Sequence, residues 1–345
     1  MGCGLHTTLA LHHGTYFTRL AERLWSGLRG RAATDAYREL DHELDNLRAA
    51  LAWALESAPA TGLRLALALG EYWDTRGMPE EQTHWTEALL KKLPNADPVA
   101  TTIARMELAR AAFRRGDLHR SAVLAKEVSM AAAQLDNPYL SVDALLPKSK
   151  LAAYGVGPEN IVPLLQEGLA VSKRQGYTMA TIEFLQNLAA VANFGGRMSE
   201  AVALCNESLE LAKRLGATRW EAISYGIRGF AQLGLGELGA SNESFNLALQ
   251  CCKRFMDNAQ VIYPLIGKAQ LALARGSTRV AIELLGAVER FCESKGTAIV
   301  PAVLQIVALR QNAAKAQVGD RVYDRFHGVG RKLQLREAIE LAERQ

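Results

Sequence analysis

The sequence predicts an all-α protein, built as a solenoid of stacked antiparallel helical hairpins. Three observations lead to this fold class. Strong helix formers dominate the composition, a glycine recurs about every twenty residues, and amphipathic segments of about seventeen residues fill the intervals. The chain has 345 residues, enough for one elongated repeat domain.

The glycines set the period of the repeat. Gly116, Gly196, Gly236 and Gly276 are spaced by 80, 40 and 40 residues, and the missing member falls at Gly155-Val156-Gly157. A second series, twenty residues out of phase, consists of Gly176, Gly216 and Gly296. Two helices of about 25 Å and two short turns account for forty residues.

The segments between the glycines carry helical apolar stripes, and we expect six hairpins. Their expected limits are 60–94, 98–135, 138–175, 177–215, 217–256 and 258–295. A further helix is expected near 297–317 and a short closing helix at 334–344. We divide this one continuous domain into an N-terminal helical cap (1–57), the repeats (58–318) and C-terminal capping helices (319–345).

Small residues recur in phase with the glycines. Seven positions before each turn stand Ala109, Ser149, Ala189, Gly229 and Ala269. Five positions after it stand Ser121, Ala201, Ser241 and Ala281, with Ile161 as the exception. Small side chains let two antiparallel helices approach closely where they cross. With turn motifs such as Gly196-Arg197, this pattern resembles tetratricopeptide repeats, whose fold is a right-handed superhelix (α-solenoid). HEAT-like repeats of similar period are the alternative.

Residues 35–56 are expected to form a single helix of the cap, with Leu40, Leu44, Leu47, Leu51 and Leu55 on its apolar face. Glu39, Asp41, Glu43 and Asp45 lie on the opposite face. Acidic side chains near a helix start favour the macrodipole, so we interpret this cluster as a solvated face rather than a metal or acid/base site.

Both ends of the chain resemble a known protein class. The N-terminal residues that carry the likeness are His13, Tyr16-Phe17 and Leu20-Ala21-Glu22, then the stretch Asp45-Asn46-Leu47-Arg48-Ala49-Ala50-Leu51 with Trp53-Ala54-Leu55. At the other end they are Phe326, Gly330-Arg331, Leu333, Leu335 and Ala338. These segments resemble the tetratricopeptide region of bacterial SARP-type and LuxR-type (MalT-like) transcriptional regulators and of related predicted ATPases with an NB-ARC or AAA-like module.

The resemblance implies a cytoplasmic, non-catalytic regulatory or sensory scaffold that acts by binding. The phosphate loop GxxxxGK[ST] of the ATPase module does not occur in the sequence, so the chain corresponds to the signal-receiving arm alone. Partners implied are a protein or peptide, an NB-ARC/AAA-like ATPase or a DNA-binding module, with neither direct nucleic-acid nor membrane contact. A sugar or other small effector, a structural oligomerisation module and, least favoured, a hydrolase with an unrecognised site are the alternatives.

No motif for chemistry stands out. The seven histidines form no HExxH and no zinc spacing with cysteine, and GxSxG, SxxK and kinase signatures are missing. The five cysteines have no CxxC spacing, and in the pair Cys251-Cys252 we expect one core thiol and one partly exposed neighbour. We therefore predict no enzyme activity, no cofactor and no metal.

The first helix of each hairpin is expected to line the concave side of the superhelix. In tetratricopeptide geometry the inward positions form a mixed groove that suits an extended peptide or a small polar ligand. These predicted groove residues are Arg110, Phe113, Gln186, Asn193, Phe230, Tyr263 and Gln270. For Phe113 and Phe230, packing between repeats is the alternative.

Overall fold

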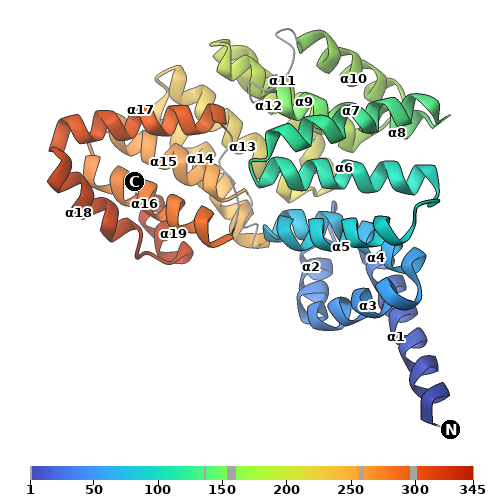
Figure 1. Ribbon diagram of the computed structural model, residues 1–345. Helices are drawn as coiled ribbons and strands as arrows, with labels where there is room; N and C mark the ends of the chain where they lie inside the picture. The colour runs from blue at the N-terminus through green and yellow to red at the C-terminus, as the bar shows by residue number, and fades with distance from the viewer. Residues whose placement is uncertain (1, 136, 154–160, 256–259, 296–300, 345) are drawn as a thin grey trace.

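The computed structural model describes residues 2–135, 137–153, 161–255, 260–295 and 301–344. These residues form a solenoid of antiparallel α-helical hairpins, and no β-strand occurs among them. Figure 1 shows α1–α5 at one end of the curved molecule and α15–α19 at the other. None of the described helices combines the length and apolar character needed to cross a bilayer.

The repeats follow the predicted forty-residue register. The hairpins pair α4 (Pro59–Arg76) with α5 (Pro79–Lys92), α6 (Pro98–Arg114) with α7 (Leu118–Gln134), α11 (Thr178–Phe194) with α12 (Met198–Leu215), α13 (Thr218–Gly234) with α14 (Leu238–Phe255), and α15 (Ile262–Ala274) with α16 (Thr278–Lys295). After them come α17 (Pro301–Val318), α18 (Asp320–Gly330) and α19 (Leu335–Glu343). The predicted hairpin limits are therefore correct to within a few residues.

The glycines end helices for a backbone reason. Gly116, Gly196, Gly236 and Gly276 have φ between 76° and 79°, a left-handed conformation that costs glycine nothing because it lacks a Cβ. Gly176 and Gly216 of the second series also have positive φ. The expected turn at Gly155-Val156-Gly157 and Gly296 lie outside the described residues.

The first arm of the third hairpin was expected to be one helix, and the structure corrects this. Its first arm is divided into α8 (Pro138–Asp143) and α9 (Leu145–Ala153), followed by α10 (Val162–Arg174). Pro147 has no backbone N–H to donate to the carbonyl of Asp143, so the helical ladder is interrupted at this point.

The small residues lie at the crossings of paired helices, as predicted. Ser121 Oγ donates to the carbonyl of Ala109 at 2.8 Å, and Ser241 Oγ donates to the carbonyl of Gly229 at the same distance. Ala189 and Ala201, at the equivalent positions of the fourth hairpin, are fully buried. A hydroxyl here bonds the backbone of the neighbouring helix because only a small side chain separates the two.

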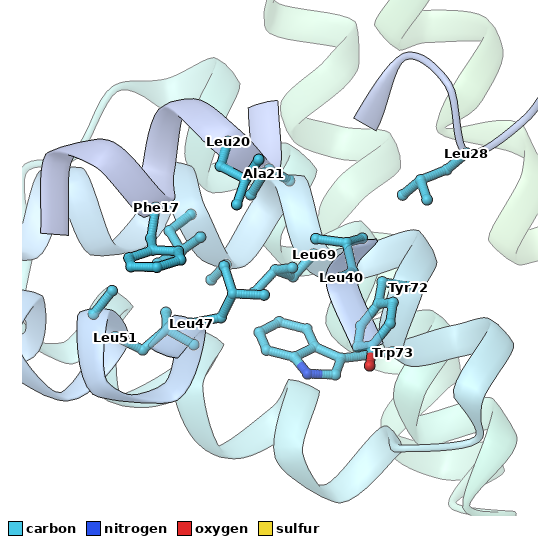
Figure 2. Packing of buried hydrophobic residues seen from close by; sticks show 14 of the residues in the cluster. Phe17, Leu20, Ala21, Leu28, Leu40, Leu47, Leu51, Leu69, Tyr72 and Trp73 are labelled. Carbon is cyan, nitrogen blue, oxygen red and sulfur yellow. The ribbon is translucent and has the colours of Figure 1, made fainter. Parts of the chain in front are cut away.

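The N-terminal cap corrects one expectation. Residues 35–56 form two helices, α2 (Ala33–His42) and α3 (Leu44–Ser57), separated at Glu43, and they follow α1 (Gly2–Trp25). The bend lets α2 and α3 both face one core, where Leu40 and Leu47 meet Trp73 (Figure 2). The capping helices therefore cover the end of the solenoid with a packed core of their own.

The acidic side chains of the cap also differ from a purely solvated face. Glu39 pairs with Arg23 at 2.9 Å, and Asp41 pairs with Arg76 at 2.6 Å. Glu43 accepts a hydrogen bond from Asn46 at 2.7 Å. The carboxylates thus turn to separate partners instead of converging on one point.

Candidate functional site

The concave side of the solenoid contains a cavity of about 330 Å³, which we call the apolar chamber. Five helices contribute to its lining. Its walls come mainly from α11 (Ala190, Asn193, Phe194), α13 (Ala222, Ile223, Gly226, Ile227, Phe230), α15 (Tyr263, Gln270) and α17 (Val303, Arg310), with Met198 of α12 and Gln260. The volume falls in the range of small-ligand pockets, which are mostly apolar with a few placed polar groups.

Glycine keeps this chamber open. A Cβ built on Gly226 meets no atom within 4 Å, although the residue itself is buried in the middle of α13. Three residues further along the same helix, a Cβ on Gly229 would lie 2.6 Å from Phe245 Cε1. Gly229 thus allows a close helix approach, whereas Gly226 leaves space on the concave side.

Few polar groups reach the apolar chamber. The Gln270 side chain is 8% exposed, and its Nε2 is buried without a hydrogen-bond acceptor among the described residues. Asn193 Nδ2 donates to the Ile227 carbonyl at 3.5 Å. Arg310 is exposed on α17. The described lining of the chamber therefore presents hydrogen-bond donors but no carboxylate.

A second, smaller cavity of about 70 Å³ adjoins the first, and we call it the charged chamber. Its charged lining residues are Glu71, Asp74, Arg110, Arg114, Glu183 and Arg219. Ile223, Ile227, Gln260 and Tyr263 line both chambers. The two cavities therefore form one continuous concave surface that is apolar at one end and charged at the other.

Ion pairs fill most of the charged chamber and join distant repeats. Arg219 at the start of α13 contacts Glu71 Oε1 at 2.6 Å and also pairs with Asp74, both on α4. Arg114 Nε donates to Asp74 Oδ1 at 2.8 Å, and Arg29 Nη2 lies 3.0 Å from Glu71 Oε2. The superhelix thus turns far enough for its first and fifth hairpins to touch.

Burial and neighbouring charges shift the pKa of two carboxyls in this network. Burial by itself would raise the pKa of Glu71, but Arg219 and Arg29 outweigh it and hold this pKa below its usual value. For Glu107, burial prevails over Arg110 and Arg29 and raises the pKa. The two neighbouring carboxyls thus have pKa values shifted in opposite directions, lowered for Glu71 and raised for Glu107.

The seven predicted groove residues all lie along this surface, but they are not equivalent. Asn193, Phe230, Tyr263 and Gln270 line the apolar chamber, and Arg110, Phe113, Gln186 and again Tyr263 line the charged chamber. Whether any of them binds a ligand stays a prediction.

Three of the seven already serve the fold. Gln186 Nε2 donates to the Trp220 carbonyl and to Ser224 Oγ, both at 2.9 Å. Arg110 pairs with Glu107 at 3.1 Å, and Phe113 is 3% exposed within a hydrophobic core. Phe230 packs edge to face on Phe245 with ring centroids 5.1 Å apart, yet stays half-buried at the chamber wall. The packing alternative therefore holds for Phe113 and only partly for Phe230.

Sequence reasoning missed the pairing of Glu71 and Asp74 with Arg219. These residues are separated by 148 and 145 positions, so no local pattern connects them. It also missed Gly226, which in the sequence is one more glycine inside a helix.

The thiols offer little reactivity. Burial raises the pKa of Cys205, Cys251 and Cys292 to about 12 in each case, so each favours the neutral thiol near pH 7. Cys252 is buried and Cys251 half-buried, as the sequence predicted. Within the described part of the chain, no group of three His, Cys, Asp or Glu side chains has the arrangement of a metal site.

A solved structure shares the fold. A Rap protein complexed with Competence and Sporulation Factor superposes with a TM-score of 0.58 at 10% sequence identity, over 98% of this chain and 100% of that chain. The apo form of RapI gives a TM-score of 0.44 at 13% identity, over 97% and 96% of the two chains. No protein-family model and no curated protein sequence matches the chain. The fold is thus that of a tetratricopeptide-like helical repeat protein.

Proposed function

We propose that this chain is a non-catalytic regulatory scaffold that binds a peptide, or an extended segment of a partner protein, along its concave surface. The observation that carries the proposal is the adjoining pair of chambers, lined by residues of six hairpins and of α17. An extended chain has apolar and polar groups spaced along its length, and such a surface offers a counterpart to both.

The Rap protein is a structural precedent for this proposal. That protein is complexed with Competence and Sporulation Factor, and it covers nearly all of this chain in the superposition. Because the identity is low, the likeness supports the scaffold and leaves the choice of partner to this chain's own lining residues.

Affinity selection tests the proposal. Pools of random hexapeptides would be passed over the wild-type chain and over Gly226→Leu, and bound peptides identified by mass spectrometry. The Cβ position on Gly226 is open and faces a residue-lined cavity, so a leucine side chain there is expected to occupy part of the apolar chamber. Peptides enriched on the wild type and lost from Gly226→Leu support the proposal, whereas no enrichment over the variant contradicts it.

A small effector is the second candidate. The apolar chamber encloses enough volume for a compact organic ligand without any help from the charged chamber. A thermal-shift screen of sugars, nucleotides and short carboxylic acids separates the candidates. A compound that raises the melting temperature of the wild type but not of Gly226→Leu would favour the effector.

We further propose that the chain acts as the signal-receiving arm of a bacterial transcriptional regulator. The asparagine-leucine-arginine stretch at 46–48 and the closing segment at 326–338 support this assignment through the likeness described above. Its partner would then be an NB-ARC/AAA-like ATPase or a DNA-binding module. Two-hybrid assays against the products of neighbouring reading frames test it, and failure with all of them would count against the assignment.

We also propose that cap, repeats and closing helices (1–57, 58–318 and 319–345) form one continuous domain. Ion pairs across the two boundaries support this: Arg29 of the cap pairs with Glu71 of the repeats, and Lys253 of the repeats pairs with Glu343 of the closing helices. A single cooperative transition in urea, seen alike by circular dichroism and tryptophan fluorescence, is expected. Two resolved transitions would contradict it.

A further inference from the structure

Gln270 is the unexplained polar group of the apolar chamber. Its amide nitrogen is buried and has no acceptor among the described residues, and the residue, which is 8% exposed, is one of those that line the cavity. Buried donors without partners are rare in proteins because each one forfeits its hydration. An acceptor on an occupant of the chamber that reaches Gln270 would satisfy this donor.

Arg310 adds a positive charge to the same chamber. It lies on α17, is exposed, and makes no hydrogen bond or ion pair with another described residue. Its guanidinium carries donors in a fixed fork that matches a carboxylate. Because none of the described lining residues is acidic, no described side chain of this wall balances the charge, which favours an anionic group.

The remaining lining restricts what can carry that anion. Ile223, Ile227, Phe230 and Val303 surround most of the cavity, so the body of the occupant must be apolar. At the other end Tyr263 and Gln260 line both chambers, so an extended chain reaches the apolar chamber along the surface that the two share. An apolar group beside a carboxylate, at the end of an entering chain, is the C-terminal residue of a peptide.

We propose that the apolar chamber takes the C-terminal end of a peptide, with an apolar last side chain and a free α-carboxylate. The carboxylate meets the guanidinium of Arg310. The peptide carbonyl that precedes the last residue accepts the hydrogen bond from Gln270 Nε2. The inference rests on the proposed peptide-binding function and specifies which part of the peptide is recognised.

The two contacts have different consequences, and this difference makes the proposal testable. Amidation of the peptide end removes the charge that faces Arg310 but leaves the carbonyl that faces Gln270. Arg310→Gln should therefore abolish the preference for free acids over amides. Gln270→Met, which keeps the side-chain length and removes the donor, should weaken acids and amides alike and keep their ratio.

The experiment is affinity selection with two hexapeptide pools, one ending in free carboxylates and one in carboxamides, followed by titration of the recovered peptides. On the wild type we expect apolar last residues and about a five- to tenfold preference for the free acid, the scale of one partly exposed charge contact. Arg310→Gln should reduce that ratio to about one, and Gln270→Met should weaken both forms about fivefold. Arg321→Gln, an exposed arginine on α18 outside both chambers, is the matched control and should change neither value.

Several outcomes would overturn the inference. Equal binding of acids and amides to the wild type, or a preference that survives in Arg310→Gln, would show that the chain end is not read, while peptide binding itself still stands. Binding of octanoate with the same dependence on Arg310 and Gln270, without any enriched peptide, would assign the chamber to a small acid. Failure of every peptide to distinguish the wild type from Gly226→Leu would instead contradict the proposed function.

Discussion

The charged chamber and the apolar chamber lie side by side on the same concave surface, but their polar groups differ in how far they are paired. In the charged chamber, side chains from α4, α6 and α13 satisfy one another through Glu71, Asp74, Arg114 and Arg219. In the apolar chamber, Gly226 and Gln270 leave space and an unused donor. The first therefore stabilises the superhelix, and the second remains available to a ligand.

The largest loss of stability is expected when an ion pair of the charged chamber is removed. Arg219→Ala leaves Glu71 and Asp74 buried with fewer counter-charges, and removal of one member of a buried pair costs roughly 3–5 kcal/mol. Urea unfolding followed by circular dichroism measures the loss. Arg336→Ala, in an exposed pair with Glu340, is the control and should change stability by less than about 0.5 kcal/mol. A loss below about 1 kcal/mol for Arg219→Ala would mean that the pairing does not hold the first and fifth hairpins together.

The next largest effect on stability is expected from leucine substitutions on two faces of α13. Gly229→Leu must displace Phe245, which lies 2.6 Å from the new Cβ position, and overpacking of this kind costs about 1–3 kcal/mol. Gly226→Leu meets open space and gains helix propensity worth up to about 1 kcal/mol, so its stability should equal or exceed that of the parent. Ala189→Leu, at a fully buried crossing, should resemble Gly229→Leu without the offset from propensity.

The denaturant midpoints of these three variants test both the open space beside α13 and the register of the helix crossings. If Gly226→Leu is destabilised as much as Gly229→Leu, the open chamber beside α13 is not there. If Ala189→Leu unfolds like the parent, the forty-residue register of the crossings is wrong.

A fold of this kind is largely predictable from its sequence because each hairpin contacts mainly its neighbours. The left-handed glycines and the small residues mark turns and crossings within twenty residues of one another, so the register could be deduced locally. The break at Glu43 was not predictable in this way, since Leu40, Leu44 and Leu47 continue one helical stripe across it. What bends the chain there is the shared core around Trp73, a tertiary requirement.

The candidate site was only partly predictable for the same reason. The helical register placed Asn193, Phe230, Tyr263 and Gln270 along the inner surface, where they line one cavity. It gave no indication that Gln186 would instead join α11 to α13, or that Arg219 would reach back to α4. Those contacts depend on the curvature of the whole superhelix.

A buried lysine is expected to make the stability of the protein depend on pH. Lys268 is inaccessible to solvent, and its Nζ donates to Asn242 Oδ1 at 2.5 Å and to Asn246 Oδ1 at 2.9 Å, with no carboxylate of a described residue in contact. Burial lowers the pKa of Lys268 to about 8. Above this value the unfolded chain binds more protons than the folded one, so stability rises with pH until the unfolded lysine also titrates.

Between pH 7 and pH 9, the wild type should therefore gain about 1 kcal/mol relative to Lys268→Met, which has no ammonium to bury. Unfolding midpoints of both proteins at the two pH values measure the difference. Parallel pH profiles would show that Lys268 keeps an ordinary pKa in the folded protein.

The smallest expected effect concerns the unused donor itself. Gln270→Met removes a buried amide nitrogen that has no acceptor among the described residues, so the ligand-free protein should become more stable by about 1 kcal/mol. Thermal unfolding without ligand measures this gain. Gln305→Met, at an exposed position of α17 outside both chambers, is the matched control and should leave the midpoint unchanged. A destabilised Gln270→Met would indicate that the fold already uses this amide.

The central claim is that the apolar chamber is the binding site, and calorimetric titration tests it most directly. One selected free-acid peptide would be titrated into the wild type and into Gly226→Leu at several temperatures. We predict that the peptide binds the wild type with a negative heat-capacity change, which is characteristic of apolar burial. We also predict at least about a hundredfold weaker binding to Gly226→Leu, a variant that is expected to be folded and no less stable. Equal affinity for both proteins would contradict it, because the ligand would then lie outside the chamber that the leucine fills.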